Sequence, residues 1–244
     1  MTLNSFQTAV GRLLREHNDT NLLSTLELGE EERSYFEDLH DTAGFRLYAG
    51  IQRSWCIGRA AKAAPLTLSV LPDEQRRLFL DDWVSAGGGT RSFYEVEAES
   101  FFDFISRRLI DPSPELSLCE FERAAQRASM GVNSVPPTDF SALTNPVCCL
   151  RRGRYAAVVR LHVDPGALLE SLQRNKPLPE LSYEPLVVMF SPGISQLWST
   201  PTADELALWQ AVEEPTVIDS LLASGHSLET IKTSLARQTL EFVG

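Results

Sequence analysis

The residues of this chain that could do chemistry are few and scattered. His162 and Asp164 stand two apart in an apolar run, so they would share one face of a strand and offer a metal ion two ligands. The same spacing is typical of two side chains that merely face water. The sequence identifies no third or fourth ligand, so we expect no metal site here. The remaining histidines, His17, His40 and His226, are isolated and are expected at the surface.

The four cysteines also give no catalytic pattern. Cys148 and Cys149 are adjacent, so on a strand their side chains would point to opposite faces. Each is expected to pack as a small buried hydrophobic residue. Cys119 lies on the apolar stripe of an expected helix and is predicted to pack there. No serine or cysteine has the surroundings of an activated nucleophile. We therefore expect no catalytic residue, and the chain is predicted not to be an enzyme by itself.

A run of three glycines, residues 87–89, precedes Thr-Arg-Ser and could bring main chain close to a ligand. It lacks the spacing of a phosphate-binding loop and the lysine that follows one. The run is predicted to be a turn between two helices.

Composition limits the partners. The chain has 244 residues, 43% of them hydrophobic, which is ample for a buried core. A formal net charge of -11 argues against nucleic acid or an anionic membrane as partner. No export signal and no apolar run of about twenty residues is visible. With cysteines that form no even-spaced framework, these features predict a cytoplasmic protein without membrane or nucleic-acid contacts.

The first half has helical periodicity throughout. Helices are expected over residues 3–16, 30–40, 41–63, 101–109 and from residue 114, where Ser113, Pro114 and Glu115 form a typical helix start. A proline-rich segment at residues 131–137 then marks a boundary. We predict two domains, a helical domain at 1–133 and a mixed domain at 134–244.

The helix expected over residues 41–63 has an unusual composition. Tyr48, Ile51 and Trp55 recur at helical spacing with Phe45 and are predicted to face inward. Three glycines interrupt the same helix, and each costs about 1 kcal/mol relative to alanine. They indicate close packing against a neighbour.

The second half has strand and turn signals. Residues 148–163 resemble a β-hairpin whose tip carries Arg151, Arg152 and Arg154. These arginines either face water or dock an acidic peptide or partner. Strands are expected at residues 186–190 and 194–198, followed by three short helices with caps at Thr202 and Ser227. The order predicts an α+β chain: an all-helical N-terminal half, then a winged-helix-like, PqqD-like mixed domain.

Parts of the sequence resemble a known family. The segments LTLSVLP, DDWVSAGGGTRSFYEVEAESFFDFI and PSPELSLCEFERA, with residues 186–244, resemble the partner subunits of multinuclear non-haem iron oxidative enzymes. These enzymes modify ribosomally made precursor peptides; relatives are the methanobactin biosynthesis C subunit and the thiaglutamate-pathway partner subunit.

The resemblance implies an accessory role. This chain would hold the leader of a precursor peptide and present its cysteine to the iron enzyme, for oxazolone and thioamide formation or for excision of the cysteine β-carbon. The partner subunit would hold the iron, and no cofactor is expected in this chain. The helical domain would contact that subunit, with Arg91, Phe93 and Tyr94 as interface residues.

The peptide is expected to add to a sheet edge beside the third C-terminal helix. The candidate peptide-binding residues are Val187, Met189, Ser195, Leu197, Ile231 and Leu235. The alternative function is a winged-helix DNA-binding regulator, which would share the order of elements. Against it, the expected third helix has only two bases, Lys232 and Arg237, for phosphate contacts.

Overall fold

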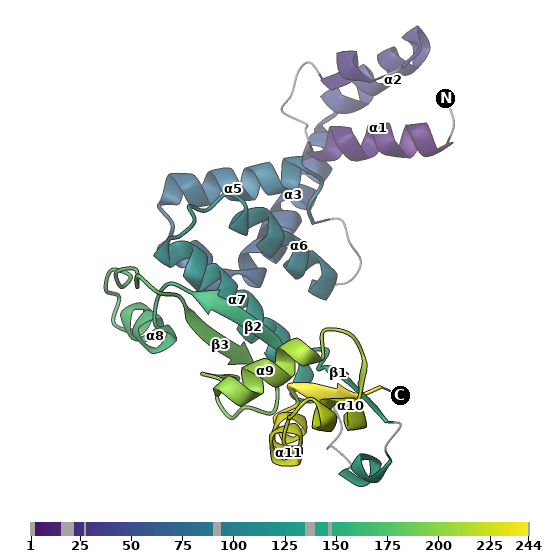
Figure 1. The fold of residues 1–244 in the computed structure, drawn as a ribbon. Helices are drawn as coiled ribbons and strands as arrows, with labels where there is room; N and C mark the ends of the chain where they lie inside the picture. Colours follow the sequence, from purple (N-terminus) through teal and green to yellow (C-terminus); the bar gives the residue numbers. More distant parts are fainter. Residues whose placement is uncertain are drawn as a thin grey trace. The chain divides into compact units, whose positions relative to one another are not determined.

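A computed structural model describes residues 3–15, 22–26, 28–89, 94–134, 140–145 and 148–243. The chain divides into two compact units, Met1–Arg108 and Leu109–Gly244, which are treated separately below. Figure 1 shows helices in the first unit and a mixture of helices and strands in the second. The predicted α+β class is confirmed at this level. Within the described residues, no helix is long and apolar enough to cross a membrane.

The first unit is built around one long helix. This helix, α3, packs against α1, α2, α4, α5 and α6 (Figure 1). The helices are α1 (Leu3–Arg15), α2 (Glu30–Asp41), α3 (Ala43–Ala63), α4 (Pro65–Val70), α5 (Asp73–Ser85) and α6 (Tyr94–Ser106), with a short 3-10 helix at Leu22–Thr25.

Aromatic packing and two ion pairs hold this unit together. The ring of Trp83 on α5 lies 5.3 Å from that of Phe101 and 5.3 Å from that of Phe104, both on α6. Arg53 of α3 pairs with Asp81 of α5, and Arg59 of α3 contacts Glu97 of α6 at 2.7 Å. At the other end of α3, Phe36, Ala9, Leu13 and Phe45 form a second small core.

The second unit holds all the strands of the described chain. Its helices are α7 (Pro114–Gly131), α8 (Pro165–Gln173), α9 (Ala203–Ala211), α10 (Ile218–Ala223) and α11 (Leu228–Ala236), with a 3-10 helix at Phe140–Thr144. Its strands are β1 (Cys149–Arg152), β2 (Ala157–Leu161), β3 (Leu186–Phe190), β4 (Trp198–Ser199), β5 (Thr216–Val217) and β6 (Leu240–Phe242).

The strands form two antiparallel three-stranded sheets. One has the order β5-β1-β6 and the other β2-β3-β4. The hairpin predicted over residues 148–163 is therefore wrong, because β1 and β2 belong to different sheets. β1 instead pairs with strands that come much later in the sequence. A local turn signal carries no information about such distant partners.

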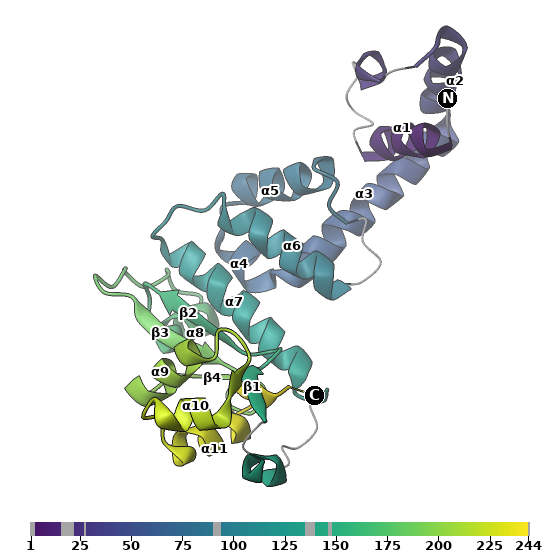
Figure 2. The same cartoon turned by 45° about the vertical axis from the view of Figure 1, so that its right-hand side comes forward.

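α7 belongs with the strands. It packs along β2 and β3, as Figures 1 and 2 show, and Phe121, Ala124 and Ala128 share a core with Leu161 and Phe190. The predicted domain boundary at residue 133 follows α7, whereas the division in the structure precedes it, at residues 108 and 109. The described part of the proline-rich segment, residues 131–134, belongs to the same unit as the strands.

α9, α10 and α11 cover the sheet that contains β1. Leu208 of α9, Leu221 of α10 and Ile231 and Leu235 of α11 pack with Leu150 of β1 in one buried cluster. The predicted caps are present: Ser227 accepts a hydrogen bond from the Thr230 N–H, and Thr202 and Glu205 form a capping box.

Candidate binding surfaces

The predicted peptide-binding residues do not share one surface. The side chains of Met189, Ile231 and Leu235 are at most 1% exposed and lie within the core cluster of the β5-β1-β6 sheet. Val187 is half-buried and Ser195 is exposed. These placements separate residues that the sequence grouped.

Ile231 and Leu235 are core residues. They lie on the face of α11 that packs against α9 and β6, and both side chains are completely buried. A peptide could not reach them without opening the core. The apolar stripe that predicted a groove is the same stripe that a buried helix needs. The expectation that these two side chains contact a peptide is corrected accordingly.

β3 is a central strand with part of one edge open. It lies between β2 and β4: β2 pairs with all five residues of β3, whereas on the other side only Met189 and Phe190 pair, with β4. The segment after it departs from the expected strand at 194–198: residues 191–197 form a turn in which Leu197 has φ 68°, and only Trp198 and Ser199 pair with β3. Leu197 is half-buried against the core under α7.

α7 packs on one face of the β2-β3-β4 sheet and is bonded near both ends of β2. The Ser117 hydroxyl of α7 accepts a hydrogen bond from the His162 N–H at 3.1 Å, just past the end of β2. The Arg127 guanidinium donates two hydrogen bonds to the Arg154 carbonyl, just before β2 begins. α7 and β2 therefore run in opposite directions with side-chain bonds at both ends.

Among the described strands, β6 pairs with β1 on one edge and with none on the other. The Val243 N–H donates to the Cys149 carbonyl, and the Thr239 carbonyl accepts from the Gly153 N–H. Because bonded residues alternate along an antiparallel strand, the N–H and C=O of Leu240 and Phe242 point away from β1. Leu240 is buried and Phe242 is half-buried, so Phe242 is the more accessible of the two. Among the described strands, β6 is the longest that forms an edge of the β5-β1-β6 sheet.

The arginines expected at a hairpin tip are engaged within this sheet. Arg151 forms an ion pair with Glu241 of β6 at 2.7 Å. The Arg152 guanidinium lies 5.0 Å from the centroid of the Trp209 ring and donates to the Trp209 carbonyl. These contacts tie β1 to β6 and α9. An acidic peptide that docked on these arginines would compete with their contacts to Glu241 and Trp209.

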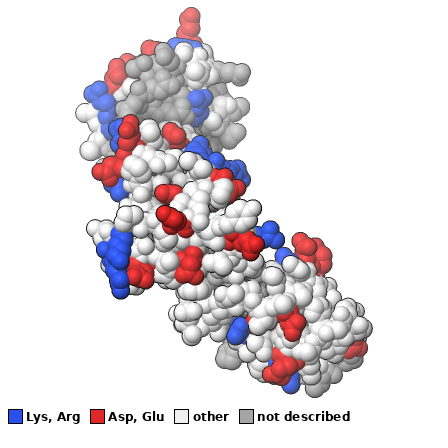
Figure 3. Space-filling view, turned by 60° about the vertical axis from the view of Figure 1, so that its left-hand side comes forward, with Lys and Arg blue, Asp and Glu red and all other residues white. Residues whose placement is uncertain are grey.

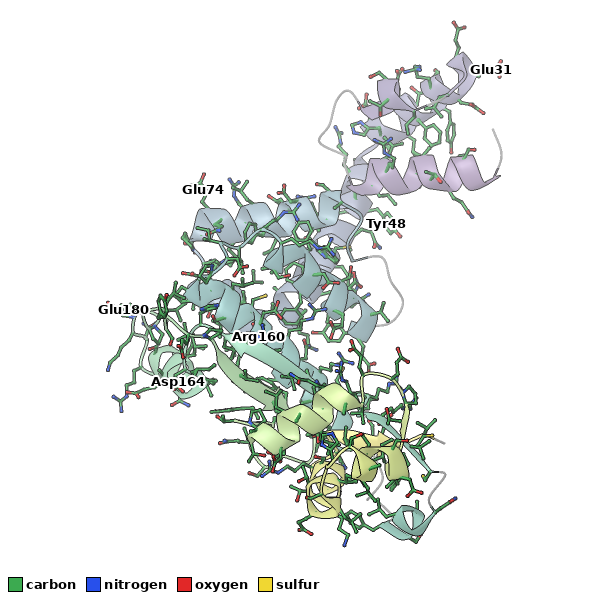
Figure 4. The ribbon with its side chains drawn as sticks, viewed as in Figure 1. Glu31, Tyr48, Glu74, Arg160, Asp164 and Glu180 are labelled. Carbon is green, nitrogen blue, oxygen red and sulfur yellow. The ribbon has the colours of Figure 1, made fainter. Side chains whose placement is uncertain are left out.

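The outward face of α3 carries a group of exposed apolar side chains. The exposed fractions are 67% for Leu47, 51% for Tyr48, 55% for Ile51 and 64% for Trp55. Figure 4 labels Tyr48 beside the N-terminal half of α3. The prediction that Tyr48, Ile51 and Trp55 face inward is wrong. The buried face carries mostly small residues, such as Ala49 and Ala60. Small residues stand out little in a hydrophobic pattern, so the sequence did not identify this face as the buried one.

The glycines of α3 face open space within the part of the chain that the structure describes. A Cβ added at Gly44, Gly50 or Gly58 would meet nothing within 4 Å. Close packing against another element of the described chain, as predicted, is therefore wrong. The glycines leave the helix backbone accessible on its solvent side.

The glycine turn after α5 does pack closely. A Cβ at Gly88 would lie 2.0 Å from the Trp83 ring, and Gly89 has φ +82° with Cys56 against it. Of the predicted interface residues, Arg91 and Phe93 lie outside the described residues. Tyr94 begins α6, where the Lys62 ammonium lies 5.9 Å from its ring centroid.

The candidate metal ligands have other contacts. The Asp164 carboxylate, labelled in Figure 4, caps α8 by accepting a hydrogen bond from the Ala167 N–H at 2.8 Å. His162 Nδ1 lies 3.4 Å from the Ser182 carbonyl oxygen. Among the residues that the structure describes, no group of three or more histidine, cysteine or acidic side chains could hold a metal ion. All four cysteines are free thiols.

Comparison with known proteins adds no assignment: no protein-family model and no curated protein matches the sequence.

Proposed function

We propose that this chain is the non-catalytic partner subunit of a multinuclear iron oxidative enzyme that modifies a ribosomally made peptide. In this proposal the second unit binds the leader of the precursor peptide, and the first unit binds the iron subunit. The support is the resemblance of residues 66–127 and 186–244 to such partner subunits, together with an edge of β6 that no described strand covers.

The unpaired edge of β6 is the observation that carries the peptide-binding part. The proposal treats α9, β5, α10, α11 and β6, which follow one another in the chain, as a winged-helix-like, PqqD-like module whose sheet includes β1. Strand addition needs an edge whose N–H and C=O groups face outward, and Phe242 presents both away from β1. The proposal moves the peptide site from β3 and the core face of α11 to this edge.

Such a subunit would act by positioning alone. A bound leader raises the local concentration of the attached cysteine at the iron site of the partner. Correct orientation of the reacting cysteine lowers the entropic part of the barrier without any catalytic group in this chain. Iron and its ligands would belong to the partner subunit.

The alternative, a DNA-binding winged helix, has weaker support. On α11, Lys232 is exposed. The other base considered for phosphate contacts, Arg237 at the C-terminal end of the helix, already pairs through its guanidinium with Glu205 at 2.6 Å. On the face seen in Figure 3, acidic side chains are scattered among the basic ones. Phosphate contacts need a concentration of positive charge. Salt-sensitive binding of a duplex by the purified chain would favour this alternative.

A proline at residue 242 tests the peptide edge. Phe242→Pro removes an N–H that points away from β1, so the pairing of β1 with β6 keeps its hydrogen bonds. We expect at least about a fivefold loss of affinity for the leader peptide, since one main-chain hydrogen bond is worth about 1 kcal/mol. Fluorescence anisotropy with a labelled leader measures it.

Phe242→Leu is the matched control, because it keeps the N–H and an apolar side chain. Its leader affinity should stay near that of the wild type. Equal affinities of the proline and leucine variants, both with wild-type circular dichroism, would remove β6 from the proposal.

Reconstitution tests the whole proposal. An iron enzyme of this class and a short cysteine-bearing precursor peptide are expected to co-purify with this chain. Peptide modification, followed by mass spectrometry, should require both the iron subunit and this chain. Full processing by the iron subunit alone would contradict the proposed role.

A further inference from the structure

The outward side of α3 has a symmetric pattern of side chains centred on Ile51. Leu47 and Trp55 lie four residues on either side of Ile51. Gly44 and Gly58 lie seven residues on either side of it. With 3.6 residues per turn, these five positions fall within a sector of about 80° around the helix. All five are exposed. A surface with this symmetry is complementary to a second copy of itself turned end for end.

The middle of this sector carries no charge. Of the bases of α3, Arg53 and Arg59 are paired with acids of α5 and α6, and Arg46 lies about 140° from Ile51 around the helix. Lys62 is the base that lies within the sector, at its C-terminal end, and it is exposed. Two apolar middles can therefore meet without bringing like charges together.

A groove along α3 provides room for the largest side chain of the pattern. It has a volume of about 600 Å³ and is lined by Leu47, Gly50 and Trp55, among others. In an antiparallel pair centred on Ile51, each residue before Ile51 faces the residue the same distance after it in the other copy. Trp55 of one copy then meets Leu47 of the other at this groove. Exposed tryptophans that fill a hollow on the partner contribute most to binding.

The glycines of the pattern permit close approach of the two helices. In the same arrangement Gly44 of one copy faces Gly58 of the other, at both ends of the contact. A Cβ added at either position would meet nothing within 4 Å in the described chain, so the helix backbone is open there. Backbones can pack closely where both faces lack side chains.

We propose that two copies of this chain associate through α3 as an antiparallel, symmetric pair whose axis passes through Ile51. A parallel pair is disfavoured because Lys62 would face Lys62 of the other copy. In the antiparallel pair, the position across from Lys62 falls at the junction of α2 and α3 in the other copy. The carboxylate at that junction, Asp41, is 79% exposed and has the opposite charge.

The exposed area is sufficient for a weak, specific dimer. Leu47, Tyr48, Ile51 and Trp55 are 51–67% exposed. Since large apolar side chains present about 150–250 Å² each, the four expose about 500 Å² per copy. A symmetric pair would bury about 1,000 Å² in total, which is the lower limit of specific interfaces. A dissociation constant in the micromolar range is therefore expected, and well below that concentration the chain is monomeric. The pair does not depend on the proposed function.

Analytical ultracentrifugation of the purified full chain tests the pair. The wild type should show a concentration-dependent equilibrium between monomer and dimer. Trp55→Glu should raise the dissociation constant at least tenfold, because it places a carboxylate in each half of the apolar contact. Leu78→Glu is the matched control on α5, where the side chain is 48% exposed outside this face, and should leave the constant unchanged.

Cross-linking tests the antiparallel arrangement. Residue 51 faces its own copy across the axis, so Ile51→Cys should give a covalent dimer under mild oxidation or with a short bis-maleimide. Leu78→Cys and the wild type, which keeps the four native thiols, are the controls and should stay monomeric on denaturing gels.

The contrary results are distinct. A wild-type chain that stays monomeric up to about 100 µM would overturn the pair. A dimer that Trp55→Glu leaves intact would overturn the role of α3, and a dimer without the Ile51→Cys cross-link would overturn the antiparallel arrangement. A monomeric wild type whose binding to the iron subunit is lost in Trp55→Glu would assign the face to that subunit and overturn the pair while supporting the proposed function.

Discussion

Burial separates residues that look alike in the sequence. Ile51 of α3 and Ile231 of α11 each lie on an apolar helical stripe, yet Ile51 is 55% exposed and Ile231 is fully buried. The stripe of α11 was predictable from its spacing, but the spacing does not say whether a face is covered by core or left free. That depends on contacts with segments far away in the sequence.

The same substitution at these two positions should therefore have opposite effects on stability. Ile231→Glu buries a carboxylate without a partner and is expected to destabilise the second unit by more than about 4 kcal/mol. Ile51→Glu should change the free energy of unfolding by less than about 0.5 kcal/mol. Thermal denaturation followed by circular dichroism distinguishes them, and similar losses at both sites would contradict the burial described.

Gly89 and Gly58 make a second contrast at the residue scale. Gly89→Ala adds a Cβ at φ +82° and 2.3 Å from the Cβ of Cys56, so a loss of about 1–3 kcal/mol is expected. Gly58→Ala adds a Cβ to open helix surface and should stabilise the helix by up to about 1 kcal/mol. Urea denaturation measures both. A neutral Gly89→Ala would show that the turn can move.

Helix starts were predictable because their signals are local. Ser113, Thr202 and Ser227 cap α7, α9 and α11 through their side chains, as the sequence indicated. Sheet membership was not predictable, because the partner strands of β1 come more than sixty residues later, at β5 and β6. The candidate peptide site moved for the same reason: only the pairing shows that β3 is central and β6 is an edge.

At the scale of elements, two ion pairs of α3 differ in their surroundings. The Glu97 side chain is 4% exposed and the Asp81 side chain 38% exposed. Within the described residues, neither carboxylate oxygen of Glu97 accepts a hydrogen bond, so the Arg59 guanidinium at 2.7 Å supplies the charge compensation.

Removal of each arginine should show this difference. Arg59→Met leaves a buried carboxylate unpaired, and a loss of about 3 kcal/mol is expected. Arg53→Met leaves Asp81 in contact with water, and the loss should stay below about 1 kcal/mol. Chemical denaturation of the two variants gives the comparison, and equal losses would place the two carboxylates in equivalent environments.

At the scale of the whole molecule, the position of α7 determines which fragments fold. A fragment of residues 109–244 keeps Phe121 and Ala128 over β2 and β3 and is expected to fold alone. A fragment of residues 134–244, cut at the boundary that the sequence indicated, exposes Leu161 and Phe190 and should aggregate. Amide exchange and light scattering test both fragments, and a soluble, protected 134–244 fragment would contradict the assignment of α7.

The pairing of β1 with β6 has a consequence for synthesis in the cell. Arg151 and Glu241 are 90 residues apart, so this sheet cannot close until residue 242 has left the ribosome. Long-range closure of this kind is slow relative to helix formation. During translation the first unit can already be folded, while the surface proposed to hold the peptide does not yet exist. In the proposed complex, a nascent chain would therefore meet the iron subunit before it recruits the precursor.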